Sequence, residues 1–187
     1  MKPEKVIAGK YVLVVDDEQD VPDTLVELLD MCRLDKASSF SEAKKLLMEN
    51  HYDIAVLDIM GVEGYNLLEI AKDRKIPAVM FTAHALSADN LKKSADEGAA
   101  YYAPKEKMHE IATFLADVFE AIDEGKSPWG RLFDRLGGYF DKKLHGSQWR
   151  GRWSPKFGQN VKLLSHLKKR KVDNDHEAKK STVLNSK

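Results

Sequence analysis

Short apolar runs alternate with helical patterns through the first 125 residues, and this alternation constrains the fold of the 187-residue chain most strongly. The run Val12–Val15 is continuously apolar, as expected of a parallel strand that is covered on both faces. Further candidate strands follow at 35–38, 54–57, 78–81 and 99–103. Five βα units predict an α/β fold with a five-stranded, doubly wound parallel sheet, in which right-handed crossovers place helices on both faces.

Helical spacing of apolar residues separates these strands. Asp20 is positioned to cap the first helix, with Pro22 in its first turn. The segment Ser39–Glu42 has the pattern of a capping box, which opens a second helix at 41–49. The remaining helices are expected at 65–72, 87–97 and 106–124.

The net charge of zero conceals a strong asymmetry between the two parts of the chain. Residues 1–125 carry 14 Lys and Arg against 25 Asp and Glu, whereas residues 126–187 carry 16 against 5. We place a domain boundary at this break. We expect a folded domain at 1–125, a basic and aromatic amphipathic tail at 126–172, and a disordered end at 173–187.

The tail contains one clear helical pattern, Trp129–Leu144, although the pair Gly137-Gly138 weakens it. A basic aromatic stretch at 149–153 and a second amphipathic segment at 161–167, which runs into basic residues at 168–171, come next. Such a tail could dock on its own domain or bind a partner protein. Basic residues between tryptophans also suit nucleic acid, and a basic amphipathic helix suits an anionic membrane surface.

Cysteine content and hydropathy indicate the compartment. Cys32 is the single cysteine, which excludes an internal disulfide and fits a reducing environment. The N-terminal residues lack the apolar core of a signal peptide, and the longest apolar runs have the length of strands rather than of membrane helices. We therefore expect a soluble cytoplasmic protein.

Polar residues end four of the expected strands. Asp58 ends the run IAVLD, Asp16-Asp17 end the first strand, Thr82 ends the fourth and Lys105 follows the fifth. The carboxyl ends of parallel strands share one crevice, so we expect these side chains to lie within reach of one another. Crowded carboxylates are costly unless a cation lies among them, so the cluster predicts a site for Mg²⁺ and a phosphoryl group.

Each residue of this cluster has a chemical task. Asp17 and Asp58 can bind Mg²⁺ directly, Asp16 through water, and the backbone carbonyl of Met60 can supply a further ligand. A carboxylate can attack phosphorus and form an aspartyl phosphate. An ammonium group such as that of Lys105 offsets the charge of the transferring phosphoryl group, and the hydroxyl of Thr82 can donate a hydrogen bond to it.

This arrangement resembles the receiver domain of bacterial two-component response regulators, the CheY-like superfamily with a flavodoxin-like fold. Five features, the first of them a pair of residues, carry the resemblance over residues 10–124, and the lysine falls seven residues after Gly98 as in the pattern GA-x-x-Y-x-x-K. The matching residues are the acidic pair Asp16-Asp17, the phosphoacceptor Asp58, Thr82, the aromatic switch position Tyr102, and Lys105.

The resemblance implies a phosphoprotein rather than an enzyme. It implies phosphotransfer from a sensor histidine kinase to Asp58, Mg²⁺ dependence and slow self-dephosphorylation. It also implies a shift of Thr82 and Tyr102 that alters the surface of the fourth helix, fifth strand and fifth helix. That surface is a candidate for a homodimer or for an unidentified downstream protein. A response regulator whose basic tail binds DNA or a membrane is the alternative.

Two features depart from the family pattern, and two other functions share parts of it. The loop after Asp58, IMGVEG, is short, and Pro104 precedes Lys105 instead of following it. A phosphohydrolase of the haloacid-dehalogenase type would need D-x-D-x-T/V after the first strand, where this chain has DDEQD. A flavin-binding flavodoxin would need a Ser/Thr-rich phosphate loop there, which this sequence lacks.

Overall fold

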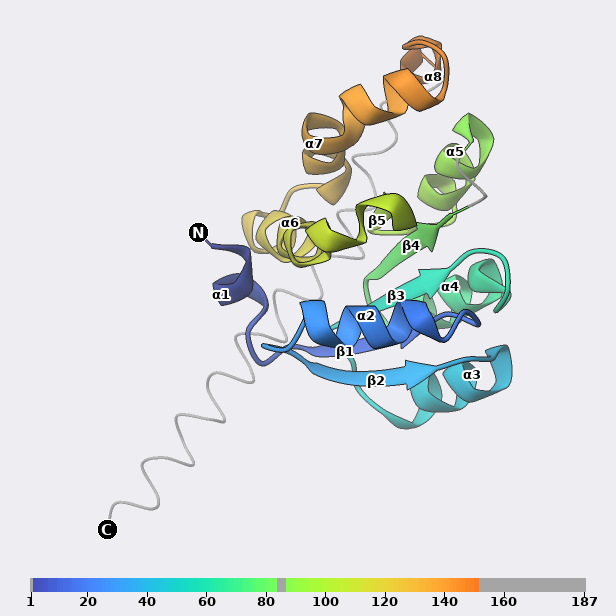
Figure 1. The fold of residues 1–187 in the computed structure, drawn as a ribbon, viewed down its shortest axis with the longest axis vertical. Coiled ribbons are helices and arrows are strands. Elements are labelled where there is room, and N and C mark those ends of the chain that lie inside the picture. Colours follow the sequence, from blue (N-terminus) through green and yellow to red (C-terminus); the bar gives the residue numbers. More distant parts are fainter. Residues whose placement is uncertain (1, 84–86, 152–187) are drawn as a thin grey trace.

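The computed structural model describes residues 2–83 and 87–151. Its sheet is parallel throughout, with the strand order β2-β1-β3-β4-β5 (Figure 1). This order is that of flavodoxin-like folds, in which the sheet grows outward on both sides of the first strand. The predicted fold class is confirmed. The strands are β1 (Tyr11–Val15), β2 (Arg33–Ala37), β3 (Ile54–Asp58), β4 (Ala78–Thr82) and β5 (Tyr101–Pro104).

Helices cover both faces of the sheet, with α2 and α6 on one face and α3, α4 and α5 on the other (Figure 1). Helices α5 and α6 are the fourth and fifth helices of the sequence pattern. The helical elements are α1 (Pro3–Ile7), α2 (Asp20–Leu28), α3 (Phe40–Glu49), α4 (Gly64–Asp73), α5 (Ala88–Asp96), the 3₁₀ helix η1 (Lys105–Glu110), α6 (Ile111–Glu124), α7 (Pro128–Lys143) and α8 (Gln148–Gly151).

Several local details differ from the sequence pattern. Asp20 is the first residue of α2 and not its cap, since the capping position is held by Gln19, whose side chain makes no capping bond. The expected helix at 106–124 is divided, because the chain first makes η1 and only then the regular helix α6. Ser39 does cap α3, where its hydroxyl accepts the backbone N–H of Glu42.

The N-terminal helix α1 was not foreseen, because it is too short to show a helical period. It packs against α6 and buries Ile7 completely. Within the described part of the chain every peptide bond is trans. Pro104 stands beside Thr82 in the register and lies on β5, an edge strand, where the missing N–H of a proline is tolerated.

The strands β3 and β4 are buried along their whole length, as is β1 beyond its first residue. This burial on both faces explains the continuously apolar sequence of these strands. A single hydrophobic core extends from the sheet into α7 and α8, where it includes Trp129, Leu132, Phe140 and Trp149.

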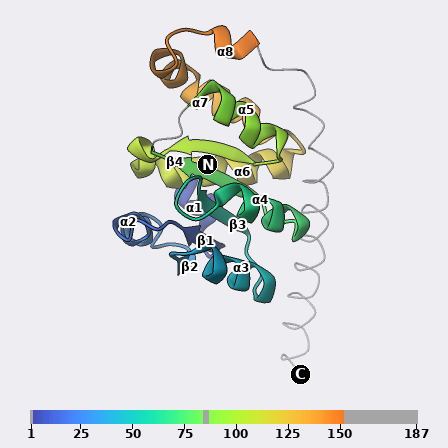
Figure 2. The same cartoon turned by 90° about the vertical axis from the view of Figure 1, so that its right-hand side faces the viewer.

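Helix α7 lies at the β5 end of the sheet, at the opposite end from β2 and α3 (Figures 1 and 2). It contacts both β5 and α6, and the indole N–H of Trp129 donates a hydrogen bond of 2.9 Å to the carbonyl of Ala99. The predicted tail helix therefore forms, and it covers the outer edge of β5. The other predicted tail features, at 152–153, 161–167, 168–171 and 173–187, lie outside the described residues.

Candidate functional site

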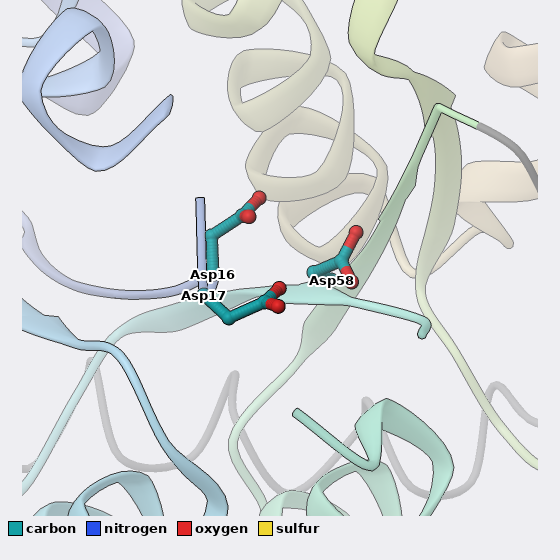
Figure 3. Close-up of side chains that lie close together, drawn as sticks. All are labelled: Asp16, Asp17 and Asp58. Atoms are coloured by element: carbon teal, nitrogen blue, oxygen red, sulfur yellow. The ribbon is translucent and has the colours of Figure 1, made fainter. Parts of the chain in front are cut away.

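The acidic residues predicted at the strand ends meet at the carboxyl edge of the sheet (Figure 3). Asp16 and Asp17 directly follow β1, and Asp58 is the last residue of the neighbouring strand β3. Each of the three residues offers an oxygen within 4.8 Å of the others. Asp16 and Asp58 are buried, whereas Asp17 faces solvent.

The loop after Asp58 folds back over its carboxylate. The backbone N–H groups of Met60 and Gly61 donate hydrogen bonds of 2.9 and 3.0 Å to Asp58 Oδ2. A Cβ atom at Gly61 would overlap the carboxylate of Asp17, so a larger residue here would have to displace that side chain. Gly64 likewise leaves no room for a Cβ beside the backbone carbonyl of Asp58. The short loop that departs from the family pattern is thus a tight turn that fixes one acceptor oxygen.

Lys105 lies at the centre of the cluster. Its ammonium nitrogen is 3.0 Å from Asp58 Oδ1, 2.8 Å from Asp16 Oδ2 and 2.9 Å from Glu18 Oε1. Burial disfavours its charge, but the hydrogen bonds to Asp16, Glu18 and Asp58 outweigh this effect and raise the pKa of Lys105. The lysine is therefore charged and held between three carboxylates.

Asp16 is the most deeply buried of the acids. Burial raises its pKa, although the hydrogen bond from Lys105 acts in the opposite direction. Its Oδ1 accepts the N–H of Glu18 and a bond from Lys105. Its Oδ2, although close to Lys105, has no partner in hydrogen-bond geometry within the described structure. A buried carboxylate oxygen without a donor is a position that a cation would satisfy.

Glu18 is a site residue that the sequence reasoning missed. It follows the acidic pair in the run DDE, and its side chain is 62% exposed while it bonds to Lys105. The third acid of this run was a weak signal for a contact with Lys105, because a buried lysine is stabilised by more than one carboxylate. Nothing in the sequence showed that this third acid, rather than Asp17, would be in contact with the ammonium group.

The two predicted switch residues lie on the adjacent strands. Thr82 is buried and ends β4, one residue beyond Phe81, which stands beside Asp58 in the register. Tyr102 is fully buried on β5, and its hydroxyl is hydrogen-bonded to the backbone of Ser87 at the start of α5. Burial raises the pKa of Tyr102. The roles of both residues as switches stay predictions.

This geometry can be compared with known proteins. The sequence model described as the response regulator receiver domain matches residues 12–115, which is more than half of the chain. The chain belongs to this family. A receiver domain is a phosphoacceptor module of two-component signalling. Within the described residues, no helix is both long and apolar enough to cross a membrane.

A curated relative shares part of this chain. The two-component response regulator ARR18 of Arabidopsis thaliana is 31% identical over 108 residues, which cover 54% of this chain and 17% of that protein. The match therefore spans about a sixth of the curated relative. Helices α7 and α8 lie beyond the residues matched by the family model.

Solved receiver domains have the same fold. The non-phosphorylated HemR receiver domain from Leptospira biflexa is 30% identical with a TM-score of 0.51, and the similarity covers 59% of this chain and 94% of that chain. A CheY-like receiver domain protein from Methanospirillum hungatei is 25% identical with a TM-score of 0.52, covering 60% and 98%. The Francisella response regulator 1452 receiver domain is 23% identical with a TM-score of 0.55, covering 60% and 98%.

Proposed function

We propose that this protein is a two-component response regulator that accepts a phosphoryl group on Asp58 from a sensor histidine kinase. The observation that carries the proposal is the contact between Asp58 Oδ1 and Lys105 at 3.0 Å, beside the two acids that follow β1. A cytoplasmic location and an output through a downstream protein are parts of the same proposal.

The acidic cluster fits a magnesium ion. Asp16, Asp17 and Asp58 would hold it, with the Met60 carbonyl as a further proposed ligand. The donor set is all oxygen, as Mg²⁺ prefers, and the carboxylates outnumber the single lysine. A bound ion would offset the negative charge on the phosphoryl oxygens.

The side chains divide the transfer step among themselves. Asp58 Oδ2 is held by two backbone N–H groups, so we assign the attack on phosphorus to Oδ1. A new O–P bond forms as the P–N bond of the phosphohistidine breaks, and its electron pair returns to the imidazole nitrogen. Lys105 and Thr82 then donate hydrogen bonds to the phosphoryl oxygens. Slow hydrolysis of the aspartyl phosphate would return the protein to its resting state.

Labelling with acetyl phosphate in Mg²⁺ tests this proposal. We expect the full chain to gain one phosphoryl group by intact mass, Asp58→Asn to gain none, and chelation of Mg²⁺ to stop the reaction. Asp53→Asn is the matched control, because Asp53 immediately precedes β3, at the opposite end from Asp58, where it accepts bonds from Tyr11 and Lys10. Full labelling of Asp58→Asn, or equal loss in both variants, would refute the assignment.

The structure limits how the proposed homodimer and the alternative output could form. A dimer through α5, β5 and α6 would require α7 to move, because α7 covers β5 and part of α6. The alternative, binding of the tail to DNA or a membrane, cannot use the Trp149 ring as it lies here. That ring is 4% exposed, and its N–H donates to Asp141. The alternative would therefore require this tryptophan to leave the core, or rely on other residues of the tail.

A further inference from the structure

Helix α7 consists of two unlike halves separated by Gly137-Gly138. In the first half, Trp129, Leu132 and Leu136 are at most 4% exposed and pack into the core of the receiver domain. Glycine is poorly suited to the middle of a helix, because its backbone is free to leave the helical conformation. Two successive glycines are therefore the weakest point in α7.

Buried polar contacts fix the first half in place. The guanidinium of Arg135 donates two hydrogen bonds, of 2.6 and 2.9 Å, to the carboxylate of Asp117 on α6. Asp117 is 3% exposed and also accepts the hydroxyl of Tyr101. If this half left the domain, Asp117 would lose both of these hydrogen bonds, and the apolar side chains of this half would leave the core. Trp129 adds its bond to Ala99, which lies two residues before β5.

The second half has only one deeply buried side chain of its own, Phe140, which lies against Tyr102 with ring centroids 6.3 Å apart. Its polar contacts with the receiver domain go to Glu106, which accepts bonds from Tyr139 at 3.1 Å and from Lys143 at 2.9 Å. The Lys143 and Glu106 side chains are 45% and 55% exposed, and ion pairs this exposed contribute little to stability.

Glu106, which binds the second half of α7, is the sequence neighbour of the site residue Lys105. Glu106 directly follows Lys105, and both belong to η1. The ammonium of Lys105 now bonds to Asp16, Glu18 and Asp58, which uses all three of its N–H donors. A phosphoryl group on Asp58 would bring additional negative charge, so the lysine would have to change partners. A backbone shift at Lys105 passes directly to Glu106.

Helix α8 contacts both halves of α7. The Trp149 ring lies 5.5 Å from the ring of Phe133 in the first half and 5.8 Å from that of Phe140 in the second. Arg150 pairs with Asp141 of the second half. Its guanidinium occupies the space where a Cβ of Gly137 would lie. The contact between Trp149 and Phe133 is thus the one that must break for the halves to separate.

We propose that α7 is a hinged strap: phosphorylation of Asp58 bends it at Gly137-Gly138 and releases its second half, together with α8, from Tyr102 and Glu106. The first half stays on β5 and α6 and keeps the edge of the sheet covered. This inference rests on the proposed function for its trigger, whereas the hinge rests on the packing of α7 alone.

Amide hydrogen exchange of the full chain in Mg²⁺, with and without beryllofluoride as a phosphoryl mimic, tests the trigger. We expect amides 139–151 to exchange roughly tenfold faster with the mimic, and amides 128–136 to be unchanged. Equal acceleration of both halves would mean release of the whole helix and would overturn the hinge. No change at 139–151 despite protection of Met60 and Gly61 would overturn the coupling.

Two pairs of variants test the hinge without the mimic. Gly138 and Gly130 both face open space, so alanine fits at either position. Gly138→Ala should slow exchange at 139–151 roughly threefold to fivefold, and Gly130→Ala should not. Lys143→Gln should accelerate it, whereas Lys142→Gln, on the exposed neighbour, should not. Identical behaviour within both pairs would reject the hinge. In the experiment with beryllofluoride, absence of protection at Met60 and Gly61 would instead reject the phosphoryl site, and with it the trigger.

Discussion

Replacing Arg135 by alanine should destabilise the fold, because it leaves the buried carboxylate of Asp117 without its cationic partner. Asp117 would keep only the hydroxyl of Tyr101 as a close partner, since Arg131 lies 4.0 Å away. Breaking a fully buried ion pair in this way costs about 3–5 kcal/mol. The Arg135 side chain is itself 36% exposed, so water can reach the vacated space, and we expect a loss of about 2 kcal/mol.

Thermal and urea unfolding measure this loss. For a chain of this length, about 2 kcal/mol corresponds to a decrease in Tm of about 4–8 °C. Arg150→Ala is the matched control, because Arg150 bonds to Asp141 with the same two-pronged geometry on the surface. The exposed pair should contribute far less.

Two more variants separate charge from packing. Arg135→Lys keeps the charge but loses the planar fork, so its stability should lie between those of the parent and the alanine variant. Adding Asp117→Asn to Arg135→Ala removes the stranded charge and should recover part of the loss. If Arg135→Ala is no less stable than Arg150→Ala, the buried pair does not anchor α7, and the reasoning is wrong.

Three other predictions concern single side chains. Glu18→Gln keeps an acceptor but removes the charge that strengthens this contact with Lys105, so acetyl phosphate should label the protein about twofold to fivefold faster, and a slower rate would contradict the competition for that donor. Gly61→Ala pushes the carboxylate of Asp17 out of the cluster and should weaken Mg²⁺ binding about 10- to 100-fold by calorimetry, so unchanged affinity would exclude Asp17 as a ligand. Burial raises the pKa of Cys32 to about 11 from 9.0, so iodoacetamide at pH 8 should alkylate it about 100-fold more slowly than in urea. The native state holds the thiol proton of Cys32 more tightly than the unfolded state does. The contribution of this thiol to the free energy of unfolding should therefore be complete below pH 9 and lost as the pH rises towards 11.

The sheet could be predicted because its information is local. Each central strand is a continuous apolar run, and a parallel topology brings the strand ends to one edge, so Asp16, Asp58 and Lys105 could be placed together without coordinates. The division between η1 and α6 could not be predicted, since both halves of that segment have a helical composition.

Long-range partners were harder to foresee. The apolar stripe of α7 indicated a buried face but not which surface would cover it. Trp149 lies in a basic, exposed-looking stretch, and its burial depends on Phe133 and Phe140, which come from an earlier helix. Glu18 contacts Lys105 across 87 residues of sequence. A pattern read along the chain contains no information about such pairings.

The position of α7 along β5 also bears on edge-to-edge pairing of the sheet with another strand. An outermost strand offers unpaired backbone groups to any other strand that approaches it, and natural proteins protect such edges. Here Trp129 binds the carbonyl of Ala99 just before β5, and the helix contacts the strand itself. A version shortened to residues 1–125 would present that open edge beside the face of α6 that α7 now covers. We expect such a fragment to aggregate with rising concentration.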